Sequence, residues 1–60
     1  MTLEEARERV GDKVVYQGVW RPEEGVITSV NNHFVFVRYG DDYGSKATLA
    51  RYLTPLAASA

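Results

Sequence analysis

Sixty residues with seven basic and eight acidic side chains, a formal net charge of −1 and no cysteine allow one small domain and exclude several classes of protein. The lack of cysteine excludes a disulfide framework and thiolate chemistry, and a single histidine argues against a zinc site. The near-balanced charge argues against a strongly basic nucleic-acid-binding domain.

A short helix is predicted at residues 2–9. Thr2 can cap it, and Glu5, three positions later, completes a capping box. The helix has one narrow apolar stripe, which consists of Leu3, Ala6 and Val10. Eight residues do not stay helical on their own, so we expect this stripe to dock on the rest of the domain.

The rest of the chain has the pattern of short strands separated by turns. β-branched and aromatic residues fill the strands, and glycine, proline and asparagine mark the turns. The predicted strands are 13–16, 25–30, 33–39, 45–48 and 54–56. The predicted connections are a long loop at 17–24, a tight turn at 31–32, a loop at 40–44 and one helical turn at 49–53. Residues 57–60 are expected to be a frayed tail, which leaves a single domain at 1–56.

This order of elements predicts an all-β fold, a small five-stranded SH3-like barrel with a short N-terminal α-helix and a single helical turn before the last strand. The stretch GVITSVNNHFVFVRYG, followed by SKAT and a terminal leucine, resembles a group of small phage and prophage proteins of unknown function. The segments EGVITSV, FVFVRYGDDYG and LARYLTPL are similar in spacing to the Tudor and KOW divisions of the SH3-like barrels. The phage-like resemblance covers nearly all of residues 10–56.

Alternation along the central hairpin predicts which side chains face the interior. The predicted interior consists of Val26, Val30, Val35 and Val37. The opposite face would then carry an apolar patch of Ile27, Phe34 and Phe36. A soluble monomer does not leave such a patch bare, so either the N-terminal helix covers it or it is an interface with another protein.

A binding groove is predicted where the first loop, the DDYG loop and the helical turn meet. Trp20 beside Arg21 has the composition of an interface hot spot, although Trp20 could equally plug one end of the barrel. Tyr43 of DDYG and Tyr52 of the helical turn border the same groove. We therefore predict a non-catalytic binding or assembly module that recognises a protein partner through these aromatic residues.

The resemblances imply two narrower ligands. The Tudor likeness implies an aromatic cage for methylated side chains, to which Tyr16, Trp20, Tyr39 and Tyr43 could contribute, but the DDYG stretch is better explained as a turn. The likeness of ARYLTPL to the end of SH3 domains implies that Tyr52 contacts proline-rich peptides. The acidic-aromatic first-loop motif of those domains is missing here, which puts proline recognition in doubt.

The alternative function is a KOW-like RNA- or DNA-binding module. The basic side chains that could converge on one side are Arg21, Arg38, Lys46 and Arg51. Against this alternative, five acidic residues lie in the same loops: Asp12, Glu23, Glu24, Asp41 and Asp42.

Enzymatic activity is not expected. His33 lies at a hairpin turn, and no nucleophile–base pair is apparent near it. The SH3-like plasmid-borne dihydrofolate reductases carry a pore motif that would align near residues 45–49, which do not match it. No cofactor and no metal ion are expected.

The acidic N-terminus does not resemble a signal peptide, and no apolar run approaches the ~20 residues needed to span a bilayer. We therefore expect no membrane association. The prediction is a soluble cytoplasmic protein, or one carried by something that replicates in the cytoplasm, which is a monomer or a weak homo-oligomer.

Overall fold

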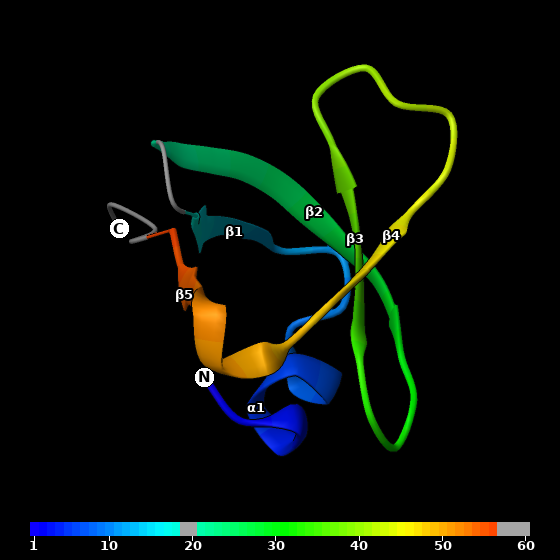
Figure 1. The fold of residues 1–60 in the computed structure, drawn as a ribbon. Helices are drawn as coiled ribbons and strands as arrows, with labels where there is room; N and C mark the ends of the chain where they lie inside the picture. Colours follow the sequence, from blue (N-terminus) through cyan, green and yellow to red (C-terminus); the bar gives the residue numbers. More distant parts are fainter. Residues whose placement is uncertain (19–20, 57–60) are drawn as a thin grey trace.

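Five antiparallel strands, one short helix and one 3₁₀ turn form the fold in the computed structural model, which describes residues 1–18 and 21–56 (Figure 1). The elements are α1 (Leu3–Glu8), β1 (Lys13–Gln17), β2 (Pro22–Val30), β3 (Val35–Tyr39), β4 (Lys46–Thr48), η1 (Ala50–Tyr52) and β5 (Leu53–Pro55). Their number, type and order confirm the sequence prediction. The predicted tail at 57–60 lies outside the described residues.

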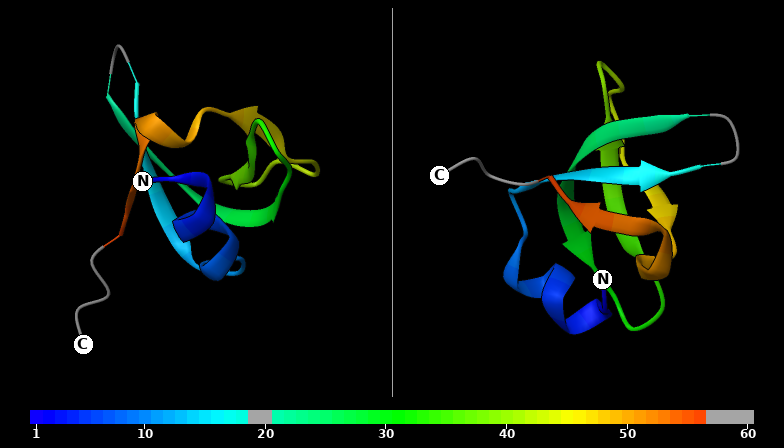
Figure 2. Two further views of the ribbon diagram at one scale, coloured as in Figure 1. Left: turned by 90° about the horizontal axis from the view of Figure 1, so that it is seen from below. Right: turned by 90° about the vertical axis from the view of Figure 1, so that its left-hand side faces the viewer.

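All five strands belong to one sheet, in the order β4-β3-β2-β1-β5. β2 is the longest strand, and it pairs with β1 through Pro22–Val26 and with β3 through Gly25–Val30. The sheet is strongly twisted and curls around its own inner face (Figure 2). Within the described residues β4 and β5 form its two edges and do not pair with each other, so the sheet is not closed.

A β-bulge in β2 determines which of its side chains reach the core. Ile27 pairs with Val37, but the next pair is Ser29 with Phe36, which leaves Thr28 as an extra residue. The Thr28 hydroxyl donates to the Phe36 carbonyl oxygen at 3.1 Å. The bulge reverses the alternation, so that Ile27 on one side of it and Val30 on the other both contact the core.

The prediction of interior residues is therefore correct for β3. In β2 it is correct for one of the two predicted residues. Val35 and Val37 are fully buried, as predicted. Val30 packs against the core, whereas Val26 is half-buried on the outer face and Ile27 takes the inward position. The alternation rule failed in β2 because it assumes an unbroken strand.

The prediction of an outer apolar patch of Ile27, Phe34 and Phe36 is wrong for Ile27. Ile27 is fully buried, Phe36 is half-buried and Phe34 is 38% exposed. Of the three, only Phe36 lies within β3 on its outer face, and Phe34 precedes that strand.

Helix α1 covers one end of the inner face of the sheet (Figure 1). The expectation that this helix covers an outer patch by docking on Phe34 and Phe36 is not met, because the helix packs against the core on the inner face. Ala6 is fully buried in the same cluster as Val35 and Val37, and Leu3 packs against that cluster, whereas Val10 is half exposed. The backbone nitrogen of Met1 also donates to the carbonyl oxygen of Leu53 at 2.9 Å. The helix therefore contributes to the core itself.

The capping box predicted for this helix is confirmed. The Thr2 hydroxyl accepts from the Glu5 backbone N–H at 3.1 Å, and the Glu5 carboxylate accepts from the Thr2 N–H at 3.2 Å. We expect Thr2→Ala to lower the free energy of unfolding by about 1 kcal/mol, measured by urea denaturation. Thr2→Ser keeps an acceptor oxygen and should retain most of the stability. Equal losses in both variants would show that the hydroxyl does not act as a cap.

The two largest differences from the predicted strand boundaries have local reasons, and the other boundaries agree within one residue. β2 begins at Pro22 rather than at residue 25, because proline is tolerated as the first residue of a strand. β3 begins at Val35 rather than at residue 33, because the Asn31 side-chain oxygen accepts from the N–H groups of His33 and Phe34, both at 2.7 Å. The turn thus extends two residues further than expected.

No helix in the described part of the chain is long and apolar enough to cross a membrane.

Candidate functional site

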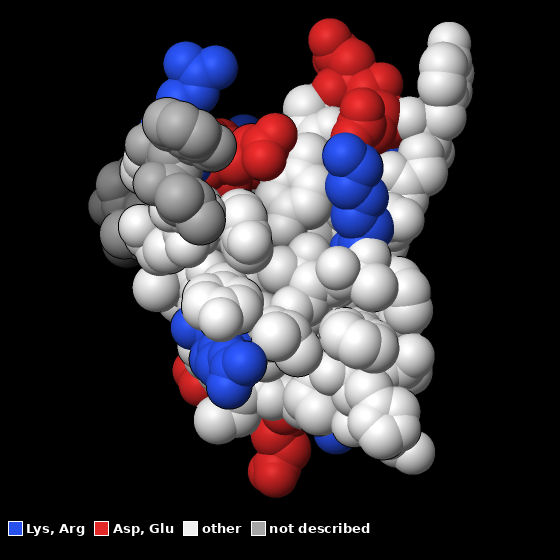
Figure 3. All heavy atoms as spheres, viewed as in Figure 1, with Lys and Arg blue, Asp and Glu red and all other residues white. Residues whose placement is uncertain are grey.

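A groove of about 340 Å³ opens on the inner face of the sheet, between β4 and the side chains of β1 and η1. Its lining residues are Tyr16, Glu23, Phe34, Tyr39, Lys46, Ala47, Thr48, Leu49 and Tyr52. In the space-filling view this face is largely uncharged, with charged side chains gathered toward its ends (Figure 3). The groove is of the size that small ligands or a few side chains of a partner occupy.

Three tyrosine rings form the aromatic part of the groove. The Tyr16 ring lies edge-to-face with Tyr39, at 6.2 Å between centroids and 69°, and with Tyr52, at 6.1 Å and 76°. The Arg51 guanidinium lies over the Tyr52 ring, 5.2 Å from its centroid. The rings come from three elements, β1, β3 and η1, so the folded sheet is what brings them together.

Tyr39 is the buried member of this cluster. Its hydroxyl hydrogen-bonds with the Thr48 hydroxyl at 2.9 Å, across from β3 to β4. Burial of the phenol raises the pKa of Tyr39 above its ordinary value, and the negative charge of Glu23 raises it further. The hydroxyl therefore stays protonated at neutral pH and acts as a fixed hydrogen-bonding group beneath the groove.

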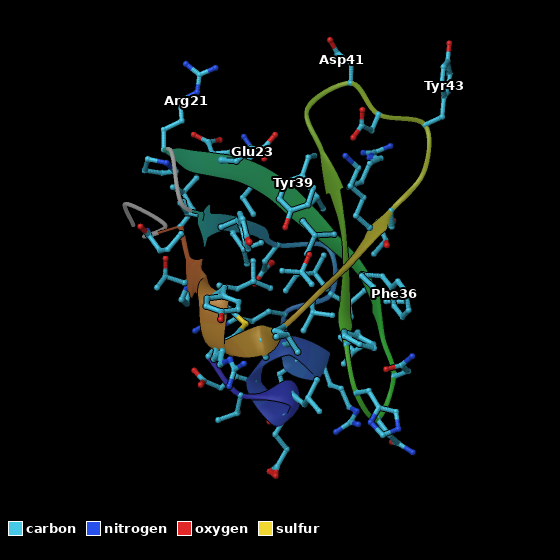
Figure 4. All side chains as sticks on the ribbon, viewed as in Figure 1. Arg21, Glu23, Phe36, Tyr39, Asp41 and Tyr43 are labelled. Carbon is cyan, nitrogen blue, oxygen red and sulfur yellow. The ribbon has the colours of Figure 1, made fainter. Side chains whose placement is uncertain are left out.

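The rim of the groove carries an acidic side chain on the inner face of the sheet. Gly25 and Ile27 face inward, so by alternation Glu23 lies on the same side, opposite Tyr16 in the β1–β2 register. Across the groove, Lys46 forms an ion pair with Asp42 at 3.8 Å. Acidic side chains gather at the top of this face in the view of Figure 3, and Figure 4 labels Glu23 in β2 and Asp41 at the tip of the β3–β4 loop.

The structure brings together only part of the predicted site. Tyr52 lines the groove and is 41% exposed. Tyr43 is fully exposed at the tip of the β3–β4 loop, and its side chain points away from the sheet (Figure 4). Arg21 also projects outward, and Trp20 lies outside the described residues. The participation of Tyr43, Arg21 and Trp20 in binding stays a prediction.

Sequence reasoning did not assign Glu23, Leu49 or Thr48 to the site, and it considered Tyr16 only for an aromatic cage. Alternation in KVVYQ was a usable signal, because Val14 faces the core and Tyr16, two positions later, lies on the same face. The position of Glu23 could have been found only by starting β2 at Pro22.

The basic side chains proposed for nucleic-acid binding do not gather on one face. Lys46 lines the groove on the inner face. Arg38 pairs with Val26 and lines a smaller outer hollow of about 180 Å³ with Lys13 and Glu24. The two cations therefore lie on opposite faces of the sheet.

His33 is exposed in the β2–β3 turn, beside Phe34. Among residues 1–18 and 21–56, no group of three or more His, Cys, Asp or Glu side chains is placed to hold a metal ion.

No protein-family model matches the chain, and no curated protein or solved structure is found to be similar to it.

Proposed function

We propose that this chain is an SH3-like barrel that serves as a non-catalytic binding module, and that its groove takes a peptide segment of a partner protein. The observation that carries the proposal is the aromatic groove, in which Tyr52 and Leu49 stay more than a third exposed. The order of the five strands, with a 3₁₀ turn directly before the last one, supports the barrel class. The phage-like resemblance stays a prediction about the origin of the chain.

The chemistry of the groove favours a peptide. Tyrosine rings supply a large contact area at a low cost in side-chain entropy, and they are enriched among the residues that dominate protein interfaces. Tyr16 is already held by two ring contacts, so little ordering is required when a partner binds. The Tyr39 and Thr48 hydroxyls and the Glu23 carboxylate offer polar contacts among the apolar ones.

The charges around the groove favour protein over nucleic acid. Glu23 would repel a phosphate backbone, and Lys46 is already paired with Asp42. The Arg51 guanidinium lies over the Tyr52 ring. RNA or DNA binding is therefore the second candidate.

The test starts from a displayed library of random linear peptides selected on the wild-type protein. We expect selected peptides to bind wild type and to lose at least about tenfold in affinity for Tyr52→Ala, because a central aromatic contact contributes about 2 kcal/mol. Titration calorimetry measures the affinity, and circular dichroism confirms that the variant is folded.

Phe36→Ala is the matched control, since it removes an aromatic ring from the outer face of the sheet. Peptide binding should survive this change. Loss of binding in Phe36→Ala but not in Tyr52→Ala would move the site to the outer face. Binding of mixed oligonucleotides that weakens steeply with salt, with no peptide selected, would favour the nucleic-acid alternative.

A further inference from the structure

The groove reaches the free edge of β4. Lys46, Ala47 and Thr48 all line it, although neighbouring residues of a strand send their side chains to opposite faces. Ala47 pairs with Phe36 on the outer face, whereas Thr48 pairs with the buried Val35. Three consecutive residues of β4 border the groove and β4 is an edge strand, so we take the groove to run along this edge.

That edge has unused backbone hydrogen-bonding groups. In an antiparallel pair, alternate residues direct both N–H and C=O toward the partner strand, and the residues between them direct both groups away. Either Ala47, or Lys46 together with Thr48, therefore points its backbone groups away from β3. Among the described residues β3 is the only strand that pairs with β4, and the Thr48 hydroxyl donates to the Lys46 carbonyl oxygen at 3.3 Å.

We propose that the partner segment binds as an extended strand added to the edge of β4, with a lysine or arginine side chain placed beside Glu23. This inference rests on the proposed function, and it specifies the shape and charge of the ligand. An added strand satisfies the free groups of β4 and lays alternate side chains into the groove. Its apolar side chains meet Phe34, Leu49 and Tyr52.

Charge complementarity selects a basic segment. Glu23 carries its carboxylate on the inner face, next to Tyr16 and close enough to Tyr39 to raise the pKa of its phenol. A cation beside Glu23 gains the attraction of the carboxylate and of the tyrosine rings together. Lys46, across the groove, is paired with Asp42 at 3.8 Å, whereas Glu23 has no ion-pair partner among the described residues. An acidic segment would be repelled at the same place.

The chain offers a matched pair of carboxylates to test the charge. Glu23 faces the groove, whereas the adjacent Glu24 lines the outer hollow with Lys13 and Arg38. Peptides selected on the wild-type protein should carry a lysine or arginine near alternating apolar residues. Glu23→Gln should weaken their binding about two- to fivefold, and Glu24→Gln should leave it unchanged. When the basic residue of the peptide is replaced by methionine, the effect of Glu23→Gln should disappear.

Backbone methylation of the peptide tests strand addition without altering the protein. We expect single N-methyl groups to cost about tenfold in affinity at alternate peptide positions and little at the positions between, because only alternate amides face β4. On peptide binding, hydrogen exchange should slow at amides within Lys46–Thr48.

Three outcomes would overturn the inference. Peptides that lose binding in Tyr52→Ala but tolerate every N-methyl group would leave the proposed function intact and exclude strand addition. Selected peptides without basic residues, or equal effects of Glu23→Gln and Glu24→Gln, would exclude the charged contact. A concentration-dependent dimer of the protein alone, dissociated by the peptide in analytical ultracentrifugation, would assign the edge to a second copy of the chain. Failure to select any peptide would instead overturn the proposed function itself.

Discussion

Ile27→Ala should lower the free energy of unfolding by about 2–5 kcal/mol, because it leaves a cavity in the centre of the core. Ile27 is among the largest of the fully buried side chains, and it lies opposite Val37 in the register. A domain of this size rarely has more than about 3–5 kcal/mol of stability, so the variant should be largely unfolded at 25 °C. Urea denaturation followed by circular dichroism measures the change.

Val26→Ala is the matched control for the position of the β-bulge. Val26 is only half-buried and lines the outer hollow, so its truncation should cost about 1 kcal/mol or less. If Ile27→Ala does not fold, Ile27→Val keeps the comparison measurable, with an expected loss of about 0.5–1.5 kcal/mol. A larger loss at Val26 than at Ile27 would mean that β2 follows simple alternation and has no bulge before Val30.

The sequence was sufficient to predict the helix, the strands and the turns. It was not sufficient to predict which side chains of β2 face the core. Turn residues, β-branched runs and the Thr2–Glu5 capping box carry local signals, and all of them correspond to observed elements. A bulge has no such signal, because it depends on how β2 pairs with β3 and not on β2 alone. The error at Ile27 then led to a second one, since cover by the helix was one of the two explanations given for the supposed outer patch.

The candidate site was harder to predict because its residues are far apart in sequence. Tyr16, Tyr39 and Tyr52 belong to three different elements, and their contacts depend on the curl of the sheet. Residue type and loop position singled out Tyr52, which lines the observed groove, but the same reasoning grouped it with Tyr43, which the structure places on an outward loop. Which face of β2 carries Glu23 follows from the strand register, which the sequence alone does not specify.

Gly25→Ala should also destabilise the fold, although a methyl group is added and none is removed. Gly25 is buried at the point where β2 pairs with both β1 and β3, opposite Val14 and Tyr39. A Cβ atom there would clash with the Val37 side chain and would lie 2.9 Å from the Tyr39 ring. Both neighbours are held in the packed core, so we expect a loss of about 1–3 kcal/mol in the free energy of unfolding.

Gly44→Ala separates this packing effect from the general effect of replacing glycine. Gly44 lies in the exposed β3–β4 loop, its φ is not positive, and a Cβ atom there would meet nothing within 4 Å. It should be neutral or slightly stabilising, because alanine restricts the unfolded chain. The Gly25 variant should also perturb Tyr39, so its loss of stability should be accompanied by a changed near-ultraviolet circular dichroism of the tyrosines. If Gly25→Ala is as stable as Gly44→Ala, the sheet does not bring Val37 and Tyr39 against β2, and the aromatic cluster built on Tyr39 would be misplaced with it.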